Sequence, residues 1–373
     1  MARRRGIVNE LKVDLTNYSY ILNGVGGIGK TTMAYELGKK ITGSNEGTFI
    51  ISIGEEPTPD HIDGALYDRA KSWDDLMDIT DELIENKSEY PNTRFVAPDS
   101  MDELFRIAEA EVIRMWNKDN PDQKVKVISQ AYKGFQKGEN KALELVITWF
   151  GSLRDAGYSL FFIGHTKQKN KKDIIQDIEF TQYTNKLESK YYEAIKDKVS
   201  IACMAYDERV LSDVTEVKDA FSKGKKKVGN LIGSKRVLVF RDDDYGIDTK
   251  SHFKHIVSKV DFSTDNFVEA VTNAIKSQLE EVKGESVTIE EMNILAEKQR
   301  AEREESIKSQ PLEESVTTIE NKDLVSQIQQ AVNDKKIDVV EMKSIMKKHS
   351  IKSFADADSL PHEGLLEIVA LIQ

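Results

Sequence analysis

The chain has 373 residues, of which 39% are hydrophobic and 31% are charged, and its formal net charge is −11. This length allows one large α/β domain with a smaller unit attached to it. Cys203 is the only cysteine, so no internal disulfide can form, and no apolar run is long enough to span a membrane. The composition therefore excludes a disulfide scaffold and a membrane protein, and it predicts a protein of the reducing cytoplasm.

The negative charge is concentrated in the C-terminal part of the chain. Residues 1–260 are nearly neutral and contain two lysine clusters, at 167–172 and 223–227. A neutral core with basic segments permits nucleic-acid binding in spite of the overall acidity.

The most specific motif lies near the N-terminus, where residues 24–31 read G-x-x-x-x-G-K-T. Glycines let backbone N–H groups surround phosphate oxygens, the lysine can reach the β- and γ-phosphates, and the threonine hydroxyl can ligate Mg²⁺. Residues 18–22 have the pattern of a buried strand and 31–41 that of a helix, so the helix N-terminus would face the phosphates. The motif predicts nucleoside triphosphate binding through Gly24, Val25, Gly26, Gly27, Ile28, Gly29, Lys30, Thr31 and Thr32.

A pair of glutamates follows the next predicted strand, residues 48–53. Open α/β sheets place their active sites at the carboxyl ends of the strands. Glu55 is therefore a candidate for orienting or deprotonating the water that attacks the γ-phosphate. Two alternatives stay open, namely that Glu56 has this role, or that both residues form an ordinary acidic turn before Pro57.

An aspartate ends the predicted strand 93–98 and precedes a strongly helical run, residues 101–116. This arrangement matches the Walker B pattern, whose carboxylate supports Mg²⁺, so Thr31 and Asp99 are the predicted metal-side residues. Pro98 stands where an apolar strand residue is usual. Asp99 or Ser100 could instead cap the following helix, and the two roles can coexist.

Two stretches combine features that suit single-stranded nucleic acid. Residues 129–138 interleave aromatic rings with lysines, and a lysine run follows Gly164-His165 at the end of the predicted strand 158–163. Rings can stack on bases and lysines can bind phosphates, whereas ordinary solvated loops are the alternative. His165 could sense the γ-phosphate. The expected nucleic-acid contacts, in two loops, are Tyr132, Lys133, Lys167, Lys169, Lys171 and Lys172.

The rest of the chain predicts the end of the core and a second unit. Residues 198–205 and 235–240 read as strands separated by a helical and then basic segment, followed by a hairpin turn that returns to Lys250. A helix over 262–279 would close the core. The expected organisation is a core over 1–280, a charged linker over 281–320, and a three-helix module over 321–373 suited to docking or assembly.

The order of these motifs resembles a RecA-like ATPase core. More closely, it resembles the phage-encoded RecA-like ATPases of the Sak group, which act as single-strand annealing recombinases. The resemblance covers about residues 15–280. It rests on Gly24–Thr31, Gly54-Glu55, Asp99-Ser100, the loop around Tyr132-Lys133-Gly134, Gly164-His165, and Asp248-Thr249-Lys250-Ser251.

The resemblance implies a RecA-like P-loop NTPase core with a mainly parallel, doubly wound sheet, plus a small C-terminal helical module. ATP and Mg²⁺ would be the cofactors, and Lys250 would reach the nucleotide of a neighbouring subunit, as an arginine finger does. The implied catalytic residues are Lys30, Glu55, Asp99, His165 and Lys250.

The same resemblance implies a function in phage homologous recombination. The protein would assemble on single-stranded DNA as a ring or filament of identical subunits and promote annealing or strand exchange. It would work in the host cytoplasm, without a membrane. The C-terminal module would contact a single-strand-binding or replication protein.

The alternative is a nucleotide-switched interaction protein, such as a helicase loader or assembly factor, that acts through its C-terminal helices. In that case the lysines would form ordinary surface. A small-molecule kinase is a third possibility, although the sequence contains no acceptor-site motif. Stimulation of ATP hydrolysis by DNA separates the first two functions.

Overall fold

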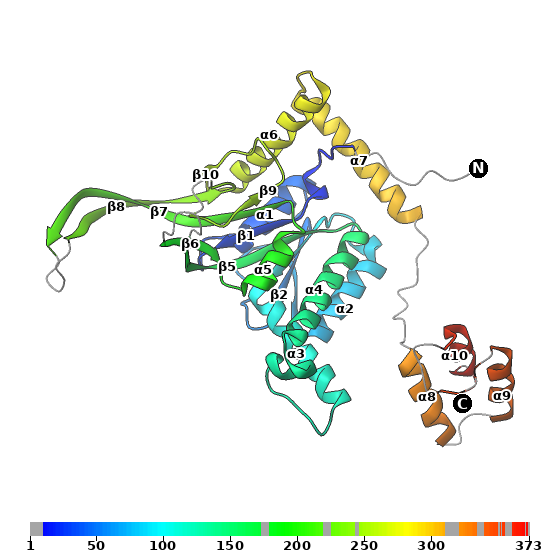
Figure 1. Ribbon diagram of the computed structural model, residues 1–373. Helices are drawn as coiled ribbons and strands as arrows, with labels where there is room; N and C mark the ends of the chain where they lie inside the picture. The colour runs from blue at the N-terminus through cyan, green and yellow to red at the C-terminus, as the bar shows by residue number, and fades with distance from the viewer. Residues whose placement is uncertain are drawn as a thin grey trace. The chain divides into compact units, whose positions relative to one another are not determined.

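The computed structural model describes residues 10–172, 179–218, 225–242, 246–309, 321–333, 339–349, 351, 353–354, 360–369 and 371. The chain divides into two compact units, Met1–Ile307 and Lys308–Gln373. The first unit contains the sheet and its covering helices, and the described part of the second contains three helices (Figure 1).

One mixed sheet forms the centre of the first unit. Its order is β10-β8-β7-β1-β5-β4-β2-β3, with β6 paired to β5 and β9 paired to β7. The strands from β3 to β7 along this order run parallel, and antiparallel strands are added at one side. The strands are β1 Tyr20–Gly24, β2 Thr48–Ile53, β3 Leu66–Ala70, β4 Phe95–Asp99, β5 Ser159–Lys172, β6 Glu179–Asn185, β7 Ile201–Lys218, β8 Lys225–Val239, β9 Lys250–Ser251 and β10 Lys259–Asp261.

Helices cover both faces of this sheet, because its strands carry buried apolar side chains on both faces. Phe161 and Phe162 are neighbours in β5, yet they belong to two separate buried clusters, because successive side chains of a strand point to opposite faces. Helices α2 to α5 pack on one face, and α1, α6 and α7 on the other. The helices are α1 Lys30–Thr42, α2 Trp73–Glu85, α3 Met101–Asp119, α4 Lys137–Asp155, α5 Ser189–Lys196, α6 Thr264–Lys283 and α7 Ile289–Ser309. The predicted doubly wound α/β class is confirmed.

Two segments expected to be loops or helix are long strands. Residues 167–172 continue β5 and pair with β6, so the predicted lysine loop is wrong. The predicted helical segment after residue 205 is also wrong, since β7 and β8 form a two-stranded ribbon that extends away from the rest of the sheet (Figure 1). Residues 219–224, between the two strands in the sequence, lie outside the described residues. Many β-branched residues in this stretch favour the extended conformation.

The predicted hairpin after β8 is not formed as expected, because the strand that contains Lys250 pairs with β7 and not with β8. Lys250 pairs with Ala202 of β7, and β8 pairs instead with β10. Residues 243–245 lie outside the described part of the chain.

The predicted charged linker begins too early. Helix α6 continues to Lys283, and α7 packs on the N-terminal segment of the first unit. The Gln299 side chain accepts a hydrogen bond from the Val13 backbone at 2.9 Å and donates one to the Leu11 carbonyl at 3.0 Å. Composition alone did not predict that this helix belongs to the core, because most of its residues are polar and only a few of them face the core.

The second unit contains the three predicted helices, α8 Asn321–Asn333, α9 Val339–Lys348 and α10 His362–Val369. They enclose a small apolar core of their own, formed mainly by Leu324, Ile328, Ala331, Met342, Ile351, Leu365 and Ile368. In the described parts of both units, no helix combines the length and apolarity that crossing a bilayer requires.

Candidate active site

The turn between β1 and α1 forms a loop around the amino end of α1. Gly27 and Gly29 have φ angles of 76° and 107°, in the left-handed region that favours glycine. A side chain on Gly24 would come within 3.0 Å of the Ala205 carbonyl oxygen. Helix α1 begins at Lys30, so its first backbone N–H groups have no partner within the helix and can bind an anion. The loop therefore has the backbone geometry of a phosphate site.

The Lys30 ammonium lies within this loop. It donates to the carbonyl oxygens of Gly24 at 3.1 Å and Val25 at 3.0 Å, and the residue is only 6% exposed. Burial lowers the pKa of Lys30, and the nearby carboxylates of Asp99 and Glu56 act in the opposite direction. A cation held in this position can neutralise the charge of bound phosphates.

A hydroxyl and a carboxylate meet beside the loop. Thr31 Oγ1 donates to Asp99 Oδ2 at 2.6 Å, and Asp99 is 8% exposed. Burial raises the pKa of the Asp99 carboxyl, while the hydrogen bond from Thr31 lowers it. Mg²⁺ prefers oxygen ligands and commonly uses one or two protein groups together with substrate phosphates. Thr31 and Asp99 fit that requirement.

The glutamate that faces the site is Glu56. Glu55 is exposed, and its backbone N–H donates to the Glu103 carboxylate at 3.1 Å. The Glu56 carboxylate accepts a hydrogen bond from Ser100 Oγ at 2.8 Å, and its charge contributes to raising the pKa of Asp99. The geometry therefore favours Glu56 over Glu55, and the catalytic role of either residue stays a prediction. Gly54, with a φ of 62°, turns the chain after β2 and so decides which glutamate points inward.

His165 lies beside the loop, because its backbone pairs with Gly24 in neighbouring strands. Its Nδ1 atom is 2.8 Å from Asp102 Oδ2 and 3.9 Å from Glu56 Oε1. The imidazole is thus hydrogen-bonded to Asp102 and lies near Glu56, beside the phosphate loop. Asp102 was not predicted, although a carboxylate in the first turn of the helix after a Walker B strand is a usable signal.

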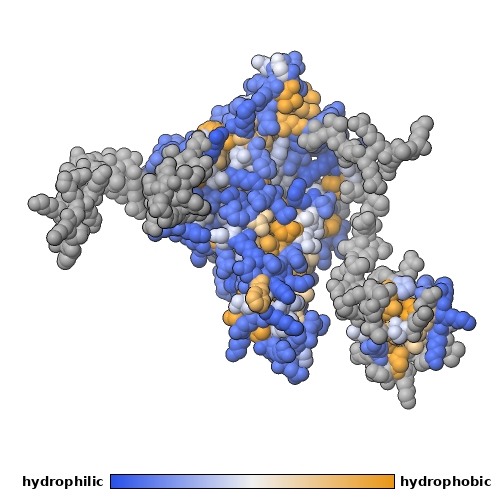
Figure 2. Space-filling model, in the orientation of Figure 1, coloured by the Kyte–Doolittle hydropathy of each residue, from blue (hydrophilic) through white to orange (hydrophobic). Residues whose placement is uncertain are grey.

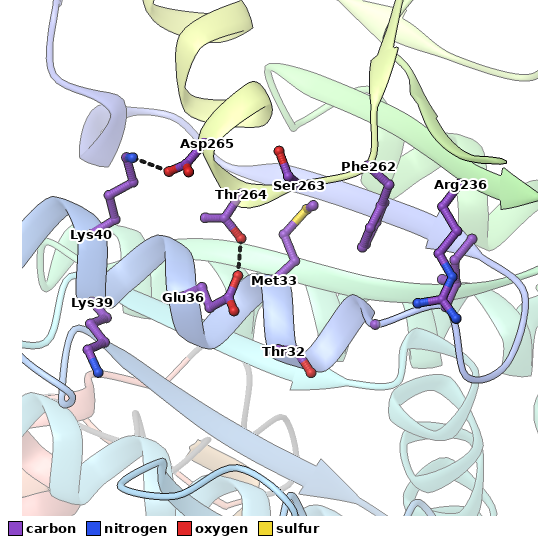
Figure 3. A pocket seen from close by; sticks show the side chains of 12 residues that line it. Thr32, Met33, Glu36, Lys39, Lys40, Arg236, Phe262, Ser263, Thr264 and Asp265 are labelled. Carbon is purple, nitrogen blue, oxygen red and sulfur yellow. Dashed lines mark hydrogen bonds and ion pairs between the residues drawn. The ribbon is translucent and has the colours of Figure 1, made fainter.

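A cavity of about 640 Å³ adjoins the phosphate loop (Figure 3). Phe262 borders the loop, since a side chain on Gly29 would lie 3.4 Å from its ring. Hydrogen bonds join Thr264 to Glu36 and Lys40 to Asp265 across the walls. Apart from Ile28, Gly29 and Thr32, sequence patterns did not identify the residues of this cavity. Its lining is Ile28, Gly29, Thr32, Met33, Glu36, Lys39, Lys40, Arg236, Phe262, Ser263, Thr264 and Asp265.

Lys250 lies away from the phosphate loop within its own chain. It pairs with Ala202, near the strand end opposite to the one that adjoins the loop. Its ammonium donates to the carbonyls of Lys196 at 2.8 Å and Asp197 at 2.9 Å, and so caps the C-terminus of α5. A role toward the nucleotide of a neighbouring subunit stays a prediction.

The structure joins the two predicted nucleic-acid segments through α5. Lys169 in β5 donates to Ser189 Oγ at 2.8 Å, and Lys190 donates to Gln136 Oε1 at 3.3 Å. Since Ser189 and Lys190 are neighbours in the first turn of α5, the strand and the 129–138 segment form one surface.

The other residues predicted to contact nucleic acid differ in exposure and in their partners within the protein. Lys133 is exposed, and Lys167 donates to the carbonyls of Lys186 and Leu187. Tyr132 is half-buried, and its ring centroid lies 5.1 Å from that of Trp116, so its packing partner is the protein itself. The backbones of Lys171 and Lys172 belong to β5, and their side chains lie outside the described set.

The chain matches the family model AAA_24, described as "AAA domain", over residues 16–244, which is more than half of its length. A similar solved structure is that of the KaiC-like protein PH0186 from the hyperthermophilic archaeon Pyrococcus horikoshii OT3. It has a TM-score of 0.34 and 11% sequence identity over 66% of this chain and 86% of that chain. No curated protein matches the chain. With its phosphate loop at the carboxyl ends of a mainly parallel, doubly wound sheet, the chain belongs to the AAA domain family and is a P-loop ATPase.

Proposed function

We propose that this ATPase depends on Mg²⁺, assembles on single-stranded DNA, and promotes annealing or strand exchange in phage homologous recombination. The observation that carries the DNA part is the joined surface of β5, α5 and the 129–138 segment, through the Lys169–Ser189 and Lys190–Gln136 contacts. Lysines on such a surface can track a phosphodiester backbone without reading its sequence.

The phosphate loop and its neighbours would bind the triphosphate. Backbone N–H groups at the start of α1 and the Lys30 ammonium would contact the phosphates, while Thr31 and Asp99 would hold Mg²⁺. The bound metal supplies positive charge that stabilises the transferred phosphoryl group. The nucleoside would extend into the adjoining cavity, where the Phe262 ring offers a face for the base.

Glu56 would position the attacking water. Ser100 fixes its carboxylate by a hydrogen bond of 2.8 Å, and the ring of His165 lies 3.9 Å away. A carboxylate held in this way can accept the proton that leaves the water during attack on the γ-phosphate.

Two connections would link the nucleotide to the DNA surface. Strand β5 runs without interruption from His165 to Lys169. In addition, the buried Asn185, at the end of β6, donates to Asn23 Oδ1 at 2.6 Å, directly before Gly24 of the loop. A shift of the loop on binding or hydrolysis would therefore change the position of the β5–β6 hairpin.

The test is the rate of ATP hydrolysis with and without single-stranded DNA, at two salt concentrations, with duplex DNA of equal length as the control. We expect single strands to stimulate turnover, and we expect the stimulation to decrease at higher salt because phosphate contacts release counterions. Turnover that ignores DNA at both salt concentrations would contradict the proposal. It would favour a nucleotide-switched interaction protein acting through the separate core of α8, α9 and α10.

A further inference from the structure

Phe135 exposes an aromatic ring almost completely. Its exposed fraction is 95%, the highest among the large apolar side chains in the part of the chain that the structure describes. The surface around α3 and α4 is otherwise mainly hydrophilic (Figure 2). A single exposed ring is smaller than the wide apolar patch that a subunit interface usually presents.

The backbone that carries this ring is held in an unusual conformation. Tyr132, Lys133, Phe135 and Gln136 have φ angles of 54°, 66°, 54° and 60°, and Gly134 between them has 76°. Residues other than glycine rarely adopt such angles, and runs of them persist only where the surroundings impose them. The turn thus presents Phe135 in a defined place.

Buried contacts fix both ends of this turn. Ala131 is fully buried, and a side chain on Gly138 would come within 2.5 Å of the Ile128 carbonyl oxygen, so the two arms approach closely. Tyr132 packs against Trp116. The anchored arms leave the tip, residues 133–136, as the part available to a partner.

Several exposed lysines in the same segment of the chain as the ring have no acidic partner among the described residues. Lys124, Lys126, Lys133 and Lys137 are exposed, and none of them has an ion pair with any residue that the structure describes. In the first turn of α4, one carboxylate oxygen of Glu139 is buried. The positive charge of these lysines favours a polyanion as the partner. It favours a second copy of this acidic chain less.

We propose that Phe135 stacks on a base of single-stranded DNA whose backbone follows Lys133, Lys190 and Lys169. The Gln136–Lys190 and Ser189–Lys169 hydrogen bonds define this path from the tip to β5. Every base offers a π-face, so this contact tolerates any sequence while requiring an unpaired strand. The inference rests on the proposed function, since it assigns a residue to its DNA partner.

The experiment compares the affinity of full-length protein for a thymidine homopolymer and for an abasic strand of the same length and charge. We expect the wild type to prefer the strand with bases by about tenfold, and Phe135→Ala to lose that preference while it keeps the affinity for the abasic strand. Phe135→Trp should keep the preference and show quenched tryptophan fluorescence on the base-containing strand. Val282→Ala, at a position 73% exposed on α6, is the matched control.

Hydrolysis of ATP without DNA and the melting temperature should not change in Phe135→Ala. An unchanged base preference in this variant would overturn the inference and leave the proposed function intact. A smaller assembly of Phe135→Ala in sedimentation without DNA would also overturn it, because the ring would then be a subunit contact. If the wild type bound neither strand, the proposed function and the inference would fail together.

Discussion

Thr31 and Asp99 come from different elements of the chain, yet their side-chain oxygens lie 2.6 Å apart. Lys30, Glu56 and His165 complete a small cluster of polar and ionisable side chains beside the phosphate loop. At the scale of single residues, the chemistry depends on this cluster, because the charges of its members affect one another. The role of each residue can be tested by a single substitution that leaves the other members of the cluster unchanged.

Lys30→Ala should abolish ATP hydrolysis and leave the fold intact. The change removes the cation that lies within the phosphate loop, and an alanine at the first position of α1 is compatible with the helix. Turnover and the melting temperature measure the two effects. A variant that retained full turnover would refute the assignment of the phosphate site.

The adjacent glutamates allow a matched comparison. Glu56→Gln should lower kcat by about 10²–10⁴-fold while nucleotide binding is kept, because an amide cannot accept the proton of the attacking water. Glu55→Gln should have little effect, since Glu55 is exposed. Rates of hydrolysis and the affinity for a fluorescent ATP analogue distinguish the two variants, and the reverse order of effects would restore Glu55 as the candidate.

At the scale of elements, α7 is held to the start of the chain by a buried carboxylate. Asp14 is 2% exposed and accepts hydrogen bonds from Arg300 and from the Thr16 backbone, both at 3.0 Å. Burial by itself would raise the pKa of Asp14, but the hydrogen bonds outweigh it and hold the pKa below its usual range. This ion pair connects Asp14, near the start of the chain, to α7, which the sequence composition had assigned to a linker.

Arg300→Ala should destabilise the first unit by about 3 kcal/mol, because it leaves the buried Asp14 charge without its partner. Denaturant titration measures this loss. Glu304→Ala, which removes the more exposed ion pair with Arg94, should cost less than about 1 kcal/mol and serves as the control. Equal losses in the two variants would show that the Asp14 contact is no more important than a surface pair.

The same pair predicts a dependence on pH. The folded-state pKa of Asp14 is lowered, so its contribution is present above the unfolded value of about 3.9 and is lost as the pH falls through the folded pKa. The stability difference between the wild type and Arg300→Ala should therefore decrease below about pH 4. Denaturant titrations at pH 7 and pH 3 test this, and a constant difference would exclude Asp14 as the cause.

At the scale of the whole molecule, the chain consists of two units with separate cores. Met1–Ile307 contains the sheet and α7, and Lys308–Gln373 contains the cluster around Leu324 and Leu365. An apolar core that closes within one unit does not need the other unit for its stability. The two units can therefore be separated experimentally.

A chain ending after Ser309 should keep the basal ATP hydrolysis and melting temperature of the first unit. A chain ending after Gly284 should be markedly less stable, because it removes α7, exposes core residues and leaves Asp14 without Arg300. Calorimetry and turnover of both proteins make the comparison. If the longer chain unfolded like the shorter one, the independence of the units would be disproved.

Local patterns in the sequence determined the elements that depend on near neighbours. The spacing of glycines, Lys30 and Thr31 identified the phosphate loop, and apolar patterns placed β2 and helices α1 and α3 within a few residues. The Walker B position of Asp99 could also be predicted, because a strand end followed by a helix leaves a signal within ten residues.

Only the tertiary structure decided features that depend on distant partners. The pairing of β5 with β6 and of β7 with β8 turned expected loop and helix into strands, and the buried contacts of α7 extended the core past residue 280. The placement of Glu56, rather than Glu55, beside the loop follows the turn at Gly54, and the exposure of Phe135 depends on the packing beneath it. Strand register and burial arise from residues far apart in the sequence, whereas periodicity and composition report only on neighbours.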